Sequence, residues 1–164
     1  MSDILPTKVL FVCLGNICRS PTAHGVFEHM VAAYGLSDRI EVDSCGTGHW
    51  HVGKAPDRRS TAKASKRGYR MDHLRARQFE PADYDRFDYI LAMDKQNLAD
   101  ILGHRPSHYE GKLGLFLDYA EGVKHEEVPD PYYGGANGFN YVLDLVEWAC
   151  EGLLADIVNA RPAQ

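Results

Sequence analysis

The sequence has no hydrophobic run long enough to cross a membrane. Its longest apolar run, VLFVCL at residues 9–14, is far short of the roughly 20 residues that a bilayer-spanning helix needs. The N-terminal MSDILPTK lacks the basic region and the long apolar region of a signal peptide. We therefore expect a cytoplasmic protein without membrane insertion.

The sequence also has few cysteines and no excess of positive charge. Four cysteines in 164 residues do not make a disulfide framework, and Cys13 with Cys18 does not match a zinc-binding pattern. The net charge of -5 argues against general affinity for nucleic acid, which usually needs a basic surface. We therefore expect free thiols, no metal, no cofactor and no nucleic-acid partner.

Apolar strands alternate with helices along the chain. The strands are expected at residues 8–14, 39–46, 87–94 and 112–120. The helices are expected at residues 20–35, 56–68, 97–104 and 142–153. This order predicts an α/β fold, a single doubly wound domain in which a four-stranded parallel sheet is flanked by helices. The domain is expected to span residues 1–164, with flexible ends at 1–7 and 160–164.

The loop after the first strand, CLGNICR at residues 13–19, has the features of an anion site. Ligands of such folds gather beyond the carboxyl ends of the strands. Gly15 and Asn16 allow a tight turn with inward N–H groups, and the next helix, with Ser20 as its expected cap, adds its positive end. Arg19 supplies a planar fork that matches two phosphate oxygens. A bound phosphoryl group therefore fits this loop.

Cys13 stands at the floor of the 13–19 loop. Inward N–H groups, the helix N-terminus and Arg19 all favour its thiolate form, and Ser20 could add a hydrogen bond to the sulfur. A thiolate beneath a phosphoryl group is placed for in-line attack on phosphorus. A lone cysteine at a strand end is usually a small buried hydrophobe, but the Gly, Asn, Arg and Ser-Pro around it favour a nucleophile.

The segment VCLGNICRSP resembles the signature of the low-molecular-weight protein tyrosine phosphatases. DPYYG at residues 130–134 is similar to the second motif of that family, and DSCGT and FDYILAMD follow the family's order between them. The resemblance implies an enzyme that hydrolyses phosphotyrosine in proteins, and small aryl phosphates, through a phosphocysteine intermediate. Cys13 would be the nucleophile, Arg19 and the loop amides would bind phosphate, and Asp130 would be the general acid and base.

The resemblance also implies residues that bind the substrate or support the loop. Tyr132 and Tyr133 would wall the pocket and Trp50 would cover the substrate ring, although packing of the loop and of the sheet edge explains them too. His73 would support the hydrogen bonds of Ser20 and its neighbours. The other expected substrate-binding residues are those of the loop, Leu14, Gly15, Asn16, Ile17 and Cys18.

The sequence leaves alternatives open for the regulation of the protein and for contacts at the rim of the substrate pocket. In related enzymes the cysteines matching Cys13 and Cys18 can close a protective disulfide, but a small buried side chain explains Cys18 equally well. The tyrosines matching Tyr132 and Tyr133 are phosphorylated in some family members, which would make a tyrosine kinase a partner. His24 stands where the family frequently has glutamate, so the family's rim contacts are not carried over there.

Two other functions use a similar anion-binding loop. An arsenate reductase needs further cysteines to relay a disulfide, whereas Cys45 and Cys150 are expected in the core. A phosphocysteine carrier passes its phosphoryl group on and would not need Asp130 for hydrolysis. The phosphatase is therefore the favoured function, and release of inorganic phosphate from an aryl phosphate distinguishes the three.

Overall fold

A four-stranded parallel sheet forms the centre of the molecule, in the order β2-β1-β3-β4. The computed structural model describes residues 5–122, 127–131 and 138–160. The strands are β1 (Thr7–Cys13), β2 (Ile40–Gly46), β3 (Tyr89–Ala92) and β4 (Lys112–Leu115). Every pairing is parallel, so the carboxyl ends of all four strands lie at the same end of the sheet. The predicted α/β fold is confirmed.

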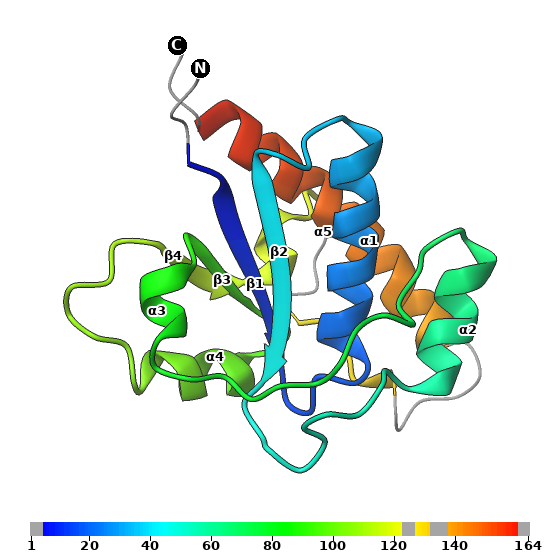
Figure 1. Cartoon of the computed structure of the whole chain (residues 1–164), viewed down its shortest axis with the longest axis horizontal. Helices are drawn as coiled ribbons and strands as arrows, with labels where there is room; N and C mark the ends of the chain where they lie inside the picture. The colour runs from blue at the N-terminus through cyan, green and yellow to red at the C-terminus, as the bar shows by residue number, and fades with distance from the viewer. Residues whose placement is uncertain (1–4, 123–126, 132–137, 161–164) are drawn as a thin grey trace.

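Helices cover both faces of this sheet. They are α1 (Arg19–Ala33), α2 (Arg58–Lys66), α3 (Asp83–Arg86), α4 (Lys95–Leu102) and α5 (Gly138–Ala160). α1, α2 and α5 lie on one side of the sheet, and α3 and α4 lie on the other (Figure 1). Because β1 pairs with β2 on one edge and β3 on the other, the winding direction reverses beside β1. Ligand sites of such folds lie at this reversal, beyond the strand ends.

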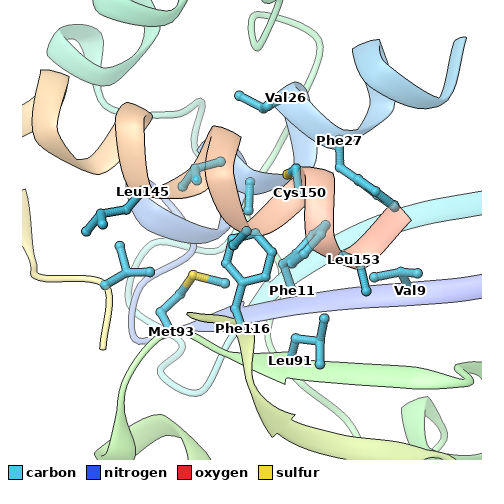
Figure 2. Close-up of a cluster of buried hydrophobic side chains, with 14 of the residues drawn as sticks. Val9, Phe11, Val26, Phe27, Leu91, Met93, Phe116, Leu145, Cys150 and Leu153 are labelled. Carbon is cyan, nitrogen blue, oxygen red and sulfur yellow. The ribbon is translucent and has the colours of Figure 1, made fainter. Parts of the chain in front are cut away.

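The side chains of β1 alternate between two apolar cores. Phe11 packs on the face that α1 and α5 cover, where its ring meets Phe27 at 5.9 Å and Phe116 at 5.0 Å between centroids. Figure 2 shows this cluster between the sheet and α5. Leu10 and Val12 belong to the smaller core on the opposite face. β1 is thus buried on both faces, as its unbroken apolar run predicts.

The predicted fourth strand is wrong beyond Leu115. Residues Phe116–Tyr119 form a 3-10 helix. In a strand, Phe116 and Leu117 would point to opposite faces of the sheet. Here both side chains are buried in the core beside α5. Two consecutive core residues on one face require a turn of helix at this point.

α1 begins one residue before the cap that its sequence predicts. Its N-cap residue is Cys18, and no side chain caps this helix end, so the capping role expected of Ser20 is wrong. α3 was not expected, because four residues are too few to show a helical period.

The ends of the described chain belong to regular elements. Thr7 opens β1, and α5 reaches Ala160. The single domain over residues 1–164 with flexible ends at 1–7 and 160–164 stays a prediction. None of the helices in the described ranges is long and apolar enough to span a bilayer.

Candidate active site

The 13–19 loop curls around the sulfur of Cys13. The backbone N–H of Asn16 donates to Cys13 Sγ at 3.2 Å, and Ser20 Oγ lies 3.0 Å from the same atom. Asn16 has a φ of 57°, the left-handed conformation that asparagine tolerates better than most residues. The tight turn is present as predicted, and Asn16 is the residue that adopts the left-handed conformation.

Arg19 returns to this loop and is held by two acceptors. Its Nη1 donates to Asp94 Oδ2 at 2.7 Å and to the carbonyl of Val128 at 3.1 Å. Burial alone would lower the pKa of Arg19, but Cys13 and Asp94 raise it above its ordinary value. Asp94 also caps α4, where its Oδ1 accepts from the N–H of Asn97 at 2.7 Å. The guanidinium is therefore fixed beside the loop and charged.

Asp94, which holds Arg19, was not among the expected site residues. It is the second residue after β3, at the same end of the sheet as Cys13. A carboxylate placed there, after a buried strand neighbouring β1, is the signal that could have identified it.

Cys13, Arg19 and Asp130 line one open cavity of about 320 Å³. The loop that carries Asp130 is tied to the end of β3, because the N–H of Val128 donates to the carbonyl of Met93 at 2.7 Å. The other described residues that line the cavity are Leu14, Gly15, Ile17, Cys18, Trp50 and His51. A sulfur and a guanidinium from the 13–19 loop and a carboxyl group from a segment distant in sequence therefore line the same cavity.

A hydrogen-bond network behind the cavity sets the direction of these donors. Asn16 Nδ2 donates to Ser20 Oγ at 2.8 Å, and Asn16 Oδ1 accepts from the backbone N–H of Arg77 at 3.0 Å. Since Ser20 Oγ already accepts this bond, its own proton is left for Cys13 Sγ at 3.0 Å or the carbonyl of Cys45 at 3.3 Å. Donors aimed at a sulfur favour its thiolate.

A model of the low molecular weight phosphotyrosine protein phosphatase family matches residues 8–163. The chain belongs to this family. A low molecular weight phosphotyrosine protein phosphatase of Schizosaccharomyces pombe is 49% identical over 144 residues, which cover 87% of this chain and 92% of that protein. The Bacillus subtilis low molecular weight protein-tyrosine-phosphatase YfkJ is 42% identical over 154 residues, covering 94% and 97%.

Solved structures of the family superpose on this fold. The crystal structure of Bacillus subtilis YfkJ has a TM-score of 0.90 at 39% identity, covering 96% of this chain and 98% of that one. A protein tyrosine phosphatase from Entamoeba histolytica has a TM-score of 0.89 at 40% identity, covering 93% and 97%. The prediction of an enzyme of this family is confirmed at the level of the family.

The aromatic residues expected from the family fall into two groups. Trp50 borders the cavity with 55% of its surface exposed, which leaves its ring free to contact a ligand. Tyr132 and Tyr133 lie outside the described residues. Their roles in substrate binding and as kinase targets stay predictions.

The supporting role expected of His73 stays a prediction. Its Nε2 lies 2.9 Å from Glu28 Oε1 at the surface, which is a partner outside the loop network. The backbone N–H of Arg77 holds Asn16 instead, and the Arg77 guanidinium is anchored by two 3.0 Å bonds to buried Asp83. A backbone donor carries no residue-type signature, so no motif could have pointed to it.

His24, where the chain departs from the family, is a buried residue of α1 and is not among the described residues that line the cavity. Its Nδ1 lies 2.9 Å from Ser44 Oγ, and its Nε2 lies 3.5 Å from Glu28 Oε2. Hydrogen bonding to His24, opposed by burial and helped by His73, lowers the pKa of Glu28 to about 2. His24 therefore joins an ionic cluster outside the cavity rather than its rim.

Gly15 and Gly46 are required because other groups approach them closely. A Cβ on Gly15 would lie 2.8 Å from Cδ2 of His51, and one on Gly46 would lie 2.7 Å from the carbonyl oxygen of Leu14. His51 was not expected in the site. Its ring packs on the loop and borders the cavity, a position that follows from the close approach to Gly15.

All four cysteines are buried free thiols. Cys45 and Cys150 have no exposed surface, so their expected place in the core is confirmed. Burial, followed by the charge of Asp57, raises the pKa of Cys18 to about 12. Cys18 is therefore a neutral thiol near pH 7, and its disulfide with Cys13 stays a prediction.

Proposed function

We propose that this protein hydrolyses phosphotyrosine in protein substrates, and small aryl phosphates, through a phosphocysteine intermediate. One observation supports this above all: Cys13, Arg19 and Asp130 line the same cavity. Family membership sets the class of reaction, and the cavity holds a nucleophile, a fixed cation for phosphate and a proton donor.

In the first step the thiolate of Cys13 attacks phosphorus and forms a P–S bond. The bond from phosphorus to the tyrosyl oxygen breaks, and that oxygen takes a proton from the carboxyl group of Asp130. The proton is needed because a phenol with a free pKa of about 10 leaves poorly as an anion. Arg19 and the loop N–H groups bind the three outer oxygens as charge builds on them.

In the second step water hydrolyses the phosphocysteine. The carboxylate of Asp130 takes a proton from the water, whose oxygen attacks phosphorus while the P–S bond breaks. Inorganic phosphate leaves and the Cys13 thiolate is restored. The N–H of Asn16 donates to Cys13 Sγ, and Ser20 Oγ can donate to the departing anion, so both groups make that sulfur a better leaving group.

The depth of the site favours phosphotyrosine over phosphoserine and phosphothreonine. Cys13 is only 3% exposed at the base of the cavity, whereas Leu14 and Trp50 at its border are 42% and 55% exposed. We expect a tyrosyl ring to span this depth and a serine side chain to be too short. No step calls for a metal or a cofactor. The four free thiols suit a reducing cytoplasm.

The direct test is phosphate release in the presence of a chelator. Phosphotyrosine, and peptides that carry it, should yield inorganic phosphate, while matched phosphoserine peptides should react much more slowly. Turnover without added thiol or arsenate also separates hydrolysis from arsenate reduction. Failure to release phosphate from any aryl phosphate would overturn the proposal.

The acid role of Asp130 predicts a loss that depends on the leaving group. Asp130→Ala should lower kcat by about 10²-fold to 10⁴-fold for phenyl phosphate, and far less for p-nitrophenyl phosphate, whose leaving group needs no proton. Glu127→Ala removes a carboxylate from the same loop and serves as the control. Equal losses on both substrates would contradict the assignment.

A further inference from the structure

We propose that a second cavity, beside the catalytic one, binds a large apolar side chain of the substrate peptide close to its phosphotyrosine. This inference rests on the proposed function and adds to it a preference for the residues that flank the phosphotyrosine. The occupant is a leucine, isoleucine, methionine or phenylalanine of the same peptide.

The second cavity is open and has a volume of about 460 Å³. Apolar side chains of Phe79, Tyr84 and Ile101 line it, and Leu14 and Trp50 line both this cavity and the catalytic one. Leu14 and Trp50 therefore form a shared wall, with catalytic groups on one side and an apolar hollow on the other. In Figure 1 the loops after β1 and β2 and helix α4 lie at the same end of the sheet.

Backbone hydrogen bonds fix this wall to the 13–19 loop. The N–H of Thr47 donates to the carbonyl of Cys13 at 2.9 Å, and the N–H of Gly48 donates to the carbonyl of Leu14 at 2.8 Å. Because the shared wall is held to the 13–19 loop, the second cavity keeps its position relative to the catalytic cavity. An extended peptide advances about 3.3 Å per residue. A side chain one or two residues from the phosphotyrosine can thus cross the wall and enter the second cavity.

The apolar lining is already formed and needs no ligand to order it. The rings of Phe79 and Tyr84 meet edge to face at 5.1 Å between centroids. The hydroxyl of Tyr84 donates to the carbonyl of Ile101, which leaves the ring face apolar. A preformed hollow of this kind binds hydrocarbon with little ordering cost. Its volume accommodates the largest aliphatic and aromatic side chains.

An unsatisfied hydroxyl indicates that a peptide, rather than an isolated hydrocarbon, occupies this place. Thr47 Oγ1 is buried and has no hydrogen-bond partner among the described residues, and Thr47 lines the second cavity. Leaving a buried hydroxyl unpaired is unfavourable. An extended peptide carries free N–H and C=O groups at every residue, so its backbone can bind this hydroxyl when the Thr47 side chain turns Oγ1 toward the cavity, while the peptide side chain fills the hollow.

The first experiment measures kcat/KM for matched peptides that differ only beside the phosphotyrosine. Leucine is placed at the first or second position on either side and compared with alanine and aspartate, and free phosphotyrosine gives the reference. One leucine position should raise kcat/KM by about tenfold over alanine, a fraction of what full burial of leucine contributes. If free phosphotyrosine is hydrolysed but no leucine peptide is preferred, the inference fails and the proposed function stands. If no phosphotyrosine is hydrolysed, the proposed function itself fails.

A variant that fills the cavity from its exposed border tests the location. His104 lies there, just beyond α4, so His104→Trp should bring the ratio of leucine-peptide to alanine-peptide kcat/KM close to one. Ala99→Trp introduces the same tryptophan at an exposed position of α4 that does not line the cavity, and should keep the preference. A preference that survives His104→Trp would overturn the inference.

Two further experiments test the role of the Thr47 hydroxyl and the possibility that a second copy of the chain fills the second cavity. Thr47→Val keeps the shape of the side chain, so it should leave the unfolding midpoint unchanged or higher and raise KM for peptides more than for free phosphotyrosine. An equal effect on both substrates would contradict peptide binding at Thr47.

Sedimentation of the wild type and of His104→Trp tests whether a second copy of the chain binds in the second cavity. Self-association that His104→Trp abolishes, with peptide preference unchanged, would overturn the inference in favour of a dimer contact.

Discussion

Cys13 and Cys18 belong to one loop and are both buried, but their surroundings differ. The sulfur of Cys13 lies 3.2 Å from the N–H of Asn16 and 3.0 Å from Ser20 Oγ. Burial and the charge of Asp57 disfavour the ionised form of Cys18 and raise its pKa to about 12. The comparison contrasts a buried sulfur that faces hydrogen-bonding groups of its loop with one whose ionised form is disfavoured by burial and by Asp57. We expect this difference in surroundings to make Cys13, and not Cys18, the nucleophile.

The largest expected effect is loss of turnover on replacing the nucleophile. Cys13→Ser should lower kcat for p-nitrophenyl phosphate by at least about 10⁴-fold, because a hydroxyl does not ionise near neutral pH. Circular dichroism should show the fold intact. If Cys18→Ser caused a loss of the same size, the two cysteines would not differ in the way that their contacts indicate.

Replacement of the fixed guanidinium should have the next largest effect. Arg19→Lys keeps the positive charge but loses the planar fork, so kcat/KM should fall by about 10²-fold to 10³-fold. Arg67→Lys changes an arginine paired with Glu147 outside the cavity and is the control. A full rescue of activity by lysine would show that charge alone, rather than geometry, serves the site.

Removal of one donor to the sulfur sharpens the comparison further. Ser20→Ala should lower kcat/KM by about tenfold to a hundredfold, since a hydrogen bond to an anion contributes about 1.5–3 kcal/mol. Ser44→Ala removes another buried serine, bonded to His24, and controls for loss of a buried hydroxyl. If both variants lost the same activity, Ser20 would have no special role toward Cys13.

The smallest effect concerns the neutral thiol of Cys18 at alkaline pH. Its folded-state pKa of about 12 lies above the ordinary thiol value of 9.0, so its contribution to stability is present below pH 9 and is lost as pH rises toward 12. Between pH 8 and pH 10, the free energy of unfolding should fall by about 1 kcal/mol more in the wild type than in Cys18→Ser. Urea titrations at the two pH values measure this. Parallel losses in both proteins would contradict it.

The elements around the site were predictable where the pattern was local and strong. The apolar run of β1 and the glycine, asparagine and arginine after it define a strand followed by an anion loop. The 3-10 helix after β4 was not predictable, because its cause is the packing of Phe116 and Leu117 on the same core. The contact of His73 with Glu28 was not predictable for the same kind of reason, because it depends on how α1 packs against the segment that carries His73.

The sequence by itself determined the order of strands and helices, the anion-binding loop with Cys13 at its floor, and the family. These depend on neighbouring residues, whose spacing fixes hydrophobic faces and turns. Only the tertiary structure decided that Asp94 and Val128 hold Arg19, that Arg77 holds Asn16, and that an apolar hollow adjoins the site. Such contacts join segments distant in sequence, and the packing of the sheet and helices selects them.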